Sequence, residues 1–117
     1  MPTEWSEHIW ISELADEPQL SEELGSVFDR VNSGAAGAIR HVVLNFSTVN
    51  YISSSHLAQL LRIRKKLVDN GRQLVVCSLS ENVWSVMMLT GLDRIFRFAP
   101  DPMTALATLQ IEGEHAG

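Results

Sequence analysis

Three consecutive serines followed by a histidine are the residues of this 117-residue chain whose types and spacing could do chemistry. Ser53, Ser54 and Ser55 follow an apolar segment, and His56 opens a run of apolar residues at helical spacing. The hydroxyl groups therefore stand where a predicted strand gives way to a predicted helix. Hydroxyls at such a junction can cap the helix, act as a nucleophile or accept a phosphate.

Helix capping is the simplest of these roles. Serine oxygens accept hydrogen bonds from backbone N–H groups that the first helical turn leaves unpaired, so Ser53 or Ser54 could be the cap. A nucleophilic serine needs a strained, glycine-flanked turn together with a base and an orienting acid. No glycine flanks these serines, and we expect neighbours at a helix start not to face one another, which argues against His56 as the base. We therefore expect no catalytic residue and no enzymatic activity.

Phosphate acceptance also has a physical basis at this position. The start of a helix offers free N–H groups and the positive end of the helix dipole, which suit an anion. A phosphorylated serine gains about −1.5 to −2 charges without disrupting the fold. If the same surface docks a partner, the added charge would block docking and turn the modification into a switch.

The other reactive side chains do not form a recognisable metal or cofactor site. The four histidines are scattered along the chain: His8, His41, His56 and His115. They form no pair at helical spacing and have no cysteine partner, and no glycine-rich phosphate loop is present in the sequence. The single cysteine, Cys77, lies in the apolar run 73–79, which predicts a buried, unreactive thiol. We expect no metal and no cofactor.

Size, charge and cysteine content limit the class of protein. A chain of 117 residues with 45% hydrophobic residues suits one globular domain, and we expect a single domain over 1–117. A net charge of −5 argues against a nucleic-acid partner. The lone cysteine fits a reducing compartment, no signal peptide is recognisable, and no apolar run approaches the roughly 20 residues that span a bilayer. We therefore expect a cytoplasmic protein without direct membrane insertion.

Apolar periodicity places the serines in an alternating series of strands and helices. The predicted strands cover 7–14, 41–46, 73–79 and 95–98. The predicted helices run from Ser21 to Gly34, from the serines to Gly71, from Ser80 to Gly91 and from Asp101 onward. This order is typical of a mostly parallel sheet covered by helices, although the opening strand could be antiparallel or at the edge. The ordered core is expected over about 7–110, followed by a loose tail at 111–117.

The two central helices carry the apolar residues that would pack on the sheet. In the helix after the serines, the predicted buried stripe consists of Leu57, Leu60, Leu61, Leu67 and Val68. In the next helix, Trp84, Met87 and Met88 are more typical of core than of an interface. Aromatic and methionine side chains also suit interfaces, so Trp84 and Met88 could line a docking surface with the serines.

Several motifs occur together at spacings that resemble one family. The family pattern is a buried strand followed by D-L-S-x-V, then D-S-S-G-L, a helix, a G-x-x-L strand and T-G-L. The corresponding segments here are Asn45-Phe46-Ser47-x-Val49, Ile52-Ser53-Ser54-Ser55-His56-Leu57, Gly71-Arg72-Gln73-Leu74-Val75-Val76 and Thr90-Gly91-Leu92. The combination resembles the STAS domain, found in sulfate transporters and anti-sigma factor antagonists. The resemblance covers roughly 20–109.

This resemblance implies an α/β domain with a mixed, mostly parallel sheet of four to five strands and helices largely on one side. Stand-alone members are similar to bacterial anti-anti-sigma factors, which regulate transcription. Such proteins bind an anti-sigma factor, often a serine-protein kinase, and so release a sigma factor. The first serine of D-S-S-G is the phosphoacceptor in the family, which implies Ser54 here, with Ser55 and Ser53 as alternatives.

Two positions depart from the family pattern. Ser53 replaces the aspartate and His56 replaces the glycine. Ser53 can still cap the helix but adds no charge beside Ser54. A protonated His56 could stabilise a phosphate on Ser54, or its bulk could obstruct a kinase, and the sequence leaves both alternatives open.

The predicted partner-binding surface combines the serine segment with the helix that follows residue 80. Its residues are Asn50, Ser53, Ser54, Ser55, His56, Trp84 and Met88. The expected partner is an anti-sigma factor or serine-protein kinase, and a weak homodimer is compatible with the sequence. The alternative function is an interaction module that is not phosphorylated, either a scaffold of a stress-signalling complex or a soluble partner of a lipid-transport ATPase.

Overall fold

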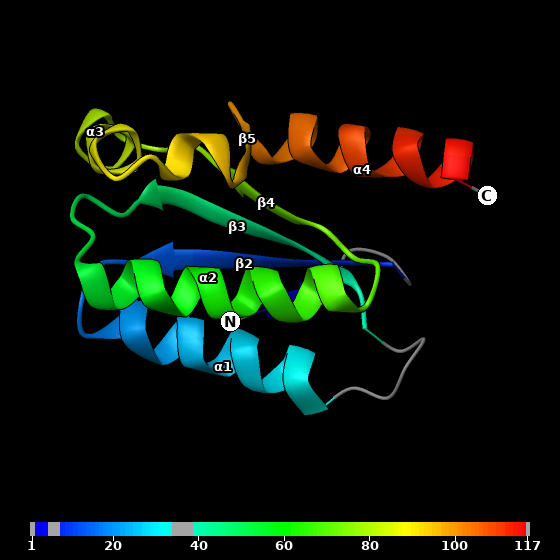
Figure 1. Cartoon of the computed structure of the whole chain (residues 1–117), viewed down its shortest axis with the longest axis horizontal. Coiled ribbons are helices and arrows are strands. Elements are labelled where there is room, and N and C mark those ends of the chain that lie inside the picture. Colours follow the sequence, from blue (N-terminus) through cyan, green and yellow to red (C-terminus); the bar gives the residue numbers. More distant parts are fainter. Residues whose placement is uncertain (1, 5–7, 34–38, 117) are drawn as a thin grey trace.

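A five-stranded sheet forms the centre of the computed structural model, which describes residues 2–4, 8–33 and 39–116 (Figure 1). The strands are β1 (Pro2–Glu4), β2 (Ile9–Ala15), β3 (His41–Thr48), β4 (Leu74–Cys77) and β5 (Arg97–Ala99). They lie in sequence order, and all neighbouring pairs are parallel except β1 and β2. The prediction of a mixed, mostly parallel sheet is confirmed. The opening strand predicted at 7–14 is β2, and the antiparallel edge belongs to β1, which the sequence did not predict.

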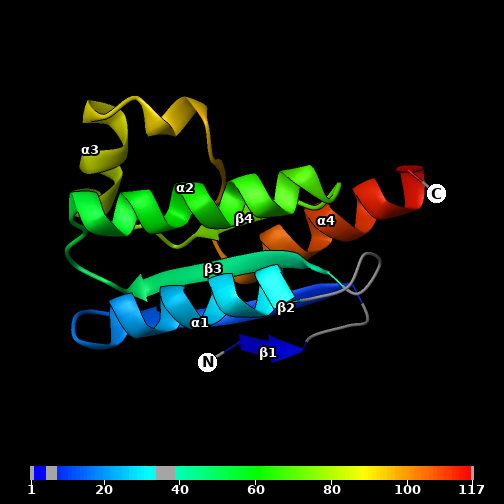
Figure 2. The same ribbon diagram turned by 60° about the horizontal axis from the view of Figure 1, so that its bottom comes forward.

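Within the described residues, four helices cover this sheet, most of them on one face (Figure 2). They are α1 (Gln19–Ser33), α2 (Ser54–Asp69), α3 (Glu81–Leu89) and α4 (Pro102–Ala116), and a short 3-10 helix, η1 (Leu92–Arg94), follows α3. One buried cluster joins residues of α1, α2, α3 and η1 to the sheet, and a smaller cluster joins α4 to its other face. Helices largely on one side are therefore confirmed.

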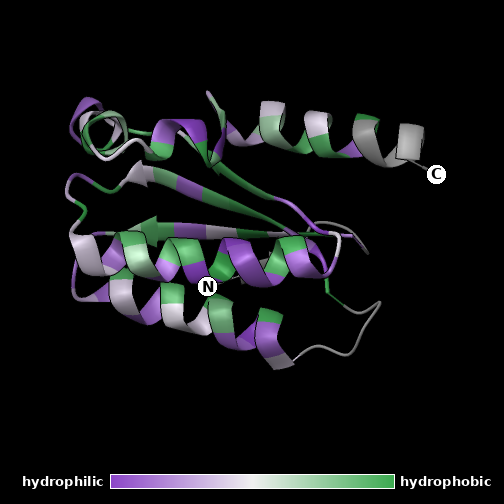
Figure 3. Ribbon diagram, viewed as in Figure 1, coloured by the Kyte–Doolittle hydropathy of each residue, from purple (hydrophilic) through white to green (hydrophobic). Residues whose placement is uncertain are grey.

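The middle strands are apolar because both faces of the sheet are covered. In β3, Val42, Leu44 and Phe46 pack in the larger cluster, whereas Val43 points to the cluster under α4. Burial on both faces favours a nearly continuous apolar run. The strand β4 is apolar throughout, and in β3 the apolar run 42–46 is interrupted by Asn45 (Figure 3). Cys77 is buried in β4, and burial raises the pKa of its thiol, as expected for an unreactive cysteine.

The buried stripe of α2 differs from the predicted one. Leu57, Leu60 and Leu67 are buried as expected, together with Ile63, which the prediction omitted. Leu61 and Val68 are instead 37% and 51% exposed. The stripe is centred on residues 60, 63 and 67, so positions 61 and 68 fall on its flank, where the helix turns away from the sheet.

The C-terminal segments also differ from the sequence prediction. The strand predicted at 95–98 lies at Arg97–Ala99, because the chain first turns at Gly91, with φ of 76°, and forms η1. The helix α4 continues to Ala116, through the segment that was expected to be a loose tail, and the looseness of that tail stays a prediction. The tail contains no proline, and a single glycine is tolerated within a helix.

Candidate functional site

The serine turn, defined here as residues 50–56, covers the end of the loop after β3 and the first turn of α2, at the carboxyl end of the parallel strands. Three loops meet at this end, because β2, β3 and β4 point the same way and each is followed by a helix. Figures 1 and 2 both place α3 and the start of α2 at this same end of the molecule. In open α/β sheets this end is where binding sites usually form.

Ser53 is the N-cap of α2. Its backbone is extended, with φ of −103° and ψ of 172°, and its hydroxyl oxygen accepts the His56 N–H at 3.4 Å. Ser54 and Ser55 begin the helix, and both are exposed. The capping role predicted for Ser53 or Ser54 is thus filled by Ser53, and the two serines after it face outward.

His56 is turned inward from the first turn of α2, and only 3% of it is exposed. Its Nδ1 accepts the backbone N–H of Ser53 at 2.9 Å, and this completes a reciprocal capping box with the Ser53 hydroxyl. Because the Ser53 N–H donates to Nδ1, that nitrogen presents a lone pair, which places a ring proton on Nε2. The expectation that these two neighbours would not face one another is wrong, since a spacing of three residues across a cap brings them together.

From the sequence, His56 could either obstruct a kinase or stabilise a phosphate on Ser54. Its position in the structure disagrees with both alternatives. Its bulk lies inside the protein, so it does not obstruct a kinase approaching Ser54. Both ring nitrogens already have partners, Ser53 at Nδ1 and Glu17 at Nε2, so neither is available to a phosphate. The same burial keeps His56 from being a surface contact for a partner, the role predicted for it.

Glu17, in the loop between β2 and α1, connects His56 to α1. Its Oε1 lies 2.9 Å from His56 Nε2 and also accepts the Ser21 N–H and hydroxyl, each at 2.7 Å. The hydrogen bonds from Ser21, and then the one from His56, hold the pKa of Glu17 below its ordinary value. Sequence reasoning missed Glu17 and Ser21. The Ser-x-x-His spacing was an available signal for the cap, but nothing local indicates the contact with Glu17.

Asp16 accepts hydrogen bonds from the first two residues of the serine turn. Its Oδ1 accepts the N–H groups of Asn50 at 2.8 Å and Tyr51 at 3.2 Å, and its Oδ2 accepts the Asn50 side-chain amide at 3.0 Å. The hydrogen bonds from Asn50 are the main cause of a lowered pKa of Asp16. Asn50 was predicted to bind a partner, and it is exposed while its side chain also fixes the turn.

The name α3 face is used here for the exposed apolar residues Trp84, Met88 and Leu89 of α3 together with Ile95, which follows η1. The helix α3 lies at the same end as the serine turn. Trp84 is 36% exposed and Met88 50% exposed, whereas Val83 and Met87 are buried. Of the two interpretations of this helix, core packing applies to Met87, whereas Trp84 and Met88 are exposed, as a docking surface requires. Trp84 packs edge-on against Phe98, with ring centroids 5.0 Å apart. Such an exposed apolar group is typical of an interaction surface.

Ser53, His56 and Glu17 resemble the three members of a hydrolase triad, but their hydrogen bonds describe a cap. The Ser53 hydroxyl lies 3.1 Å from His56 Nδ1, yet the lone pair of that nitrogen already accepts the Ser53 N–H. A base needs that lone pair to take the hydroxyl proton. The arrangement orders the helix start and does not activate Ser53.

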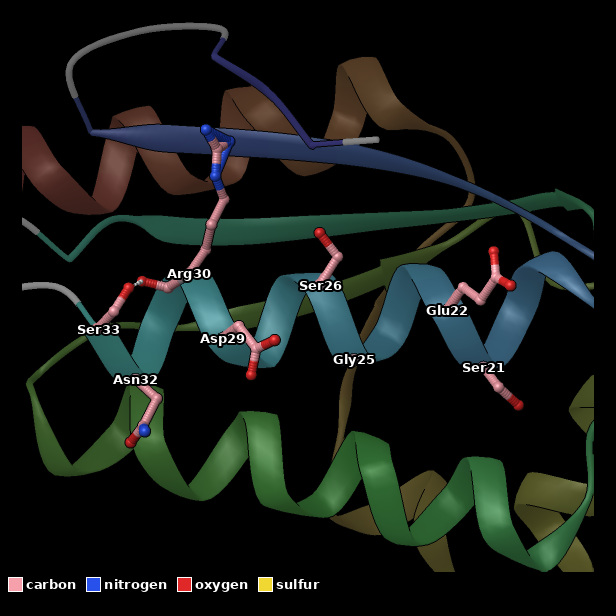
Figure 4. Close-up of a pocket in the computed structure, with 8 residues that line it drawn as sticks. All are labelled: Ser21, Glu22, Gly25, Ser26, Asp29, Arg30, Asn32 and Ser33. Atoms are coloured by element: carbon pink, nitrogen blue, oxygen red, sulfur yellow. Dashed lines mark hydrogen bonds between the residues drawn. The ribbon is translucent and has the colours of Figure 1, made fainter.

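An open depression lies along the surface of α1 (Figure 4). It is lined by Ser21, Glu22, Gly25, Ser26, Asp29, Arg30, Asn32 and Ser33. Small-molecule sites are mostly enclosed and lined by apolar side chains, whereas this depression is open and its side chains are polar or charged. Across the part of the chain that the structure describes, no helix combines the length and apolar character needed to cross a bilayer.

Comparison with known proteins identifies the family. The sequence model of the STAS domain matches residues 10–105. This chain belongs to the STAS domain family. BtrV of Bordetella bronchiseptica, which is named as an anti-sigma factor antagonist, is 31% identical over 96 residues, covering 82% of this chain and 77% of BtrV.

Solved STAS structures share the fold at lower identity. An anti-sigma-factor antagonist (STAS) domain protein from Planctomyces limnophilus superposes with a TM-score of 0.79 at 17% identity, covering 94% of this chain and 97% of its own. The Bacillus cell fate determinant SpoIIAA, solved in its phosphorylated form, gives a TM-score of 0.68 at 15% identity, covering 93% and 97%. At these identities the likeness establishes the fold alone.

Proposed function

We propose that this STAS protein is a bacterial, cytoplasmic anti-sigma factor antagonist. It binds an anti-sigma factor that is a serine-protein kinase, frees a sigma factor for transcription, and is switched by phosphorylation of Ser54. It acts by binding and carries no enzymatic activity of its own. The observation that carries the proposal is Ser54, exposed at the start of α2 in a turn held by hydrogen bonds on both sides.

The choice among the three serines follows from their environments. The Ser53 oxygen is engaged in the cap, so phosphorylating it would remove the cap that orders α2. Ser54 and Ser55 are exposed, and Ser54 occupies the acceptor position of the family motif. The name of BtrV supports the antagonist role, and the phosphorylated form of SpoIIAA supports a phosphate on a STAS domain.

The neighbouring charges explain how a phosphate could act as a switch. Asp16 and Glu17 are ionised at neutral pH, since their hydrogen bonds lower both pKa values. A phosphate adds about −1.5 to −2 charges to an end of the molecule that already carries these carboxylates. A partner surface that tolerates the unmodified end would then meet repulsion and a larger desolvation cost. The α3 face would supply the apolar part of the same contact.

The test uses candidate anti-sigma kinases from the source bacterium. Each is incubated with this protein and ATP, and the intact protein is weighed by mass spectrometry. We expect a gain of roughly 80 Da, one phosphate group. The gain should disappear in Ser54→Ala and persist in Ser55→Ala. Binding of the unmodified protein to the same kinase, and its loss after phosphorylation, complete the test. A protein that neither binds nor is modified by any of these kinases would contradict the proposal.

A second function is favoured by one observation. The α3 face is exposed without any involvement of the serines, so it could bind a partner constitutively. The protein would then be a scaffold of a stress-signalling complex or a soluble partner of a lipid-transport ATPase. Partner binding that is unchanged by Ser54→Glu, with no phosphate gained, would favour this alternative.

A further inference from the structure

We propose that Glu17 is a positioning residue for the serine turn: through His56 it sets the conformation in which Ser54 is presented. The consequence for phosphorylation rests on the proposed function, whereas the effect on the turn can be measured without any partner. Glu17 lies in a different loop and does not itself belong to the serine turn. Its influence passes through one buried ring.

The first step is the selection of the His56 tautomer. A neutral imidazole carries its proton on either nitrogen, and its two forms are close in energy when nothing distinguishes them. Glu17 Oε1 lies 2.9 Å from Nε2, and a carboxylate only accepts hydrogen bonds. It therefore stabilises the form with the proton on Nε2. That form leaves a lone pair on Nδ1 for the Ser53 N–H at 2.9 Å.

The second step is the loss of stability that the other His56 tautomer, with its proton on Nδ1, would cause. With the proton on Nδ1, the ring would direct a donor at the Ser53 N–H, and two donors cannot share a hydrogen bond. The first turn of α2 would lose the reciprocal half of its cap in a site where His56 is only 3% exposed. Buried groups left without a partner are destabilising, so the turn would open to find another conformation.

The third step is the fixing of Glu17 itself. Ser21 donates both its N–H and its hydroxyl to Oε1 from the first turn of α1. Its oxygen also lies 3.4 Å from His56 Nε2. Figure 4 shows Ser21 pointing away from the sheet strands, toward the side on which α2 lies. The groups that face the His56 ring therefore come from the β2–α1 loop, from α1 and from the cap of α2, and Glu17 is the charged one among them.

The fourth step relates this link to the sequence. The family motif has an aspartate and a glycine where this chain has Ser53 and His56. A carboxylate at the cap would accept N–H bonds directly. Here a neutral serine caps the helix, and the carboxylate acts from Glu17 with the histidine between them. Ser53 and His56, the two departures from the motif, thus belong to one series of hydrogen bonds that ends at Glu17.

The tautomer of His56 is the direct readout. Ring nitrogen and proton shifts are recorded by NMR for the wild type, Glu17→Ala, Glu17→Gln and the control Glu22→Ala, with His56→Asn used for assignment. We expect one form, protonated at Nε2, in the wild type and in Glu22→Ala. Glu17→Ala should populate both forms. Glu17→Gln should restore the wild-type form, because its amide oxygen still accepts from Nε2.

Amide exchange at Ser53 measures the effect on the turn. We expect exchange about fivefold to tenfold faster in Glu17→Ala, as for the loss of one net hydrogen bond of ~1 kcal/mol. If Glu17→Ala does not fold, Glu17→Asp serves instead, since it keeps the charge but withdraws the carboxylate by one methylene. A wild-type tautomer and wild-type exchange in these variants would overturn the proposal.

The consequence for Ser54 is tested with the kinase that phosphorylates it. We expect kcat/KM for phosphate transfer to fall about tenfold in Glu17→Ala and to recover most of its value in Glu17→Gln. An altered tautomer with an unchanged transfer rate would overturn the link to phosphorylation. A wild type that accepts no phosphate would refute the proposed function, while tautomer and exchange would still decide whether Glu17 positions the turn.

Discussion

Two strand-to-helix junctions at the same end of this STAS domain begin their helices in the same way but differ in what surrounds the cap. Ser53 caps α2 and Ser80 caps α3, each with an extended backbone and a hydroxyl that accepts the N–H three residues later, at 3.4 Å and 3.3 Å. The cap at Ser53 is reciprocated by His56 and linked to Glu17. The third residue after Ser80 is Val83, which cannot reciprocate.

The comparison shows which hydrogen bonds are needed to begin a helix and which ones are additional at the serine turn. A serine alone is enough to begin α3, so the further hydrogen bonds at α2 are not required for capping. They order the backbone on which Ser54 and Ser55 are exposed. After the other junction, α3 exposes large apolar side chains, Trp84, Met88 and Leu89. One junction thus holds hydroxyls in a fixed position, and the other offers surface that a partner could cover.

The largest expected effect on stability comes from His56→Ala. This variant removes a buried ring, its two hydrogen bonds and the partner of the Ser53 N–H, so unfolding should become easier by about 2–3 kcal/mol. Urea unfolding followed by circular dichroism measures it. His56→Gln is the matched control, because glutamine at this position can complete a capping box without reaching Glu17. A loss below about 0.5 kcal/mol in His56→Ala would mean that the two junctions are equivalent.

Trp84→Ala tests the apolar junction. Aromatic residues at the centre of interfaces often contribute about 2 kcal/mol or more, so we expect partner affinity to fall at least about tenfold. Stability should change less, because Trp84 is already 36% exposed and its ring packs edge-on against Phe98, which is itself only partly buried. Calorimetric titration and thermal unfolding separate the two effects. Met103→Ala is the control, an exposed apolar residue on α4. Equal affinities of Trp84→Ala and Met103→Ala would place the interface elsewhere.

Removing either cap hydroxyl should lower the free energy of unfolding by a smaller amount. Ser80→Ala should cost about 1 kcal/mol of unfolding free energy, the usual loss for an N-cap. Ser53→Ala should cost somewhat more, up to about 2 kcal/mol, because the His56 N–H also loses its acceptor within a coupled arrangement. The double variants Ser53→Ala/His56→Ala and Ser80→Ala/His56→Ala show whether the effects add. Non-additivity confined to the first pair is expected, and additivity in both would argue against coupling at the serine turn.

The sequence predicted the parts of this fold that depend on local pattern. The run His41–Phe46 was recognisable as a strand buried on both faces, and a serine cap before α2 followed from residue type alone. The α2 stripe was misjudged at Leu61 and Val68, because leucine and valine are apolar wherever the helix places them. The contact between Glu17 and His56 was missed for a different reason. It joins the β2–α1 loop to the first turn of α2, which are distant in the sequence, and the parallel pairing of β2 and β3 and the packing of α1 against α2 bring them together.

Acidification should have the smallest effect on stability, and the free energy of unfolding should decrease as the pH falls. Asp16 and Glu17 have folded pKa values below their ordinary ones, so they contribute stability that is complete above about pH 4–5. This contribution is lost as the pH falls through the lowered values, because the folded state must then take up protons against its hydrogen bonds. Urea midpoints between pH 7 and pH 3 should fall less in Glu17→Gln than in the wild type. The Glu22→Gln variant, whose site lacks the contacts to Ser21 and His56, should follow the wild type. Parallel curves for the wild type and Glu17→Gln would mean that the charge of Glu17 contributes nothing to the serine turn. The amide oxygen that glutamine retains would then be enough to hold His56.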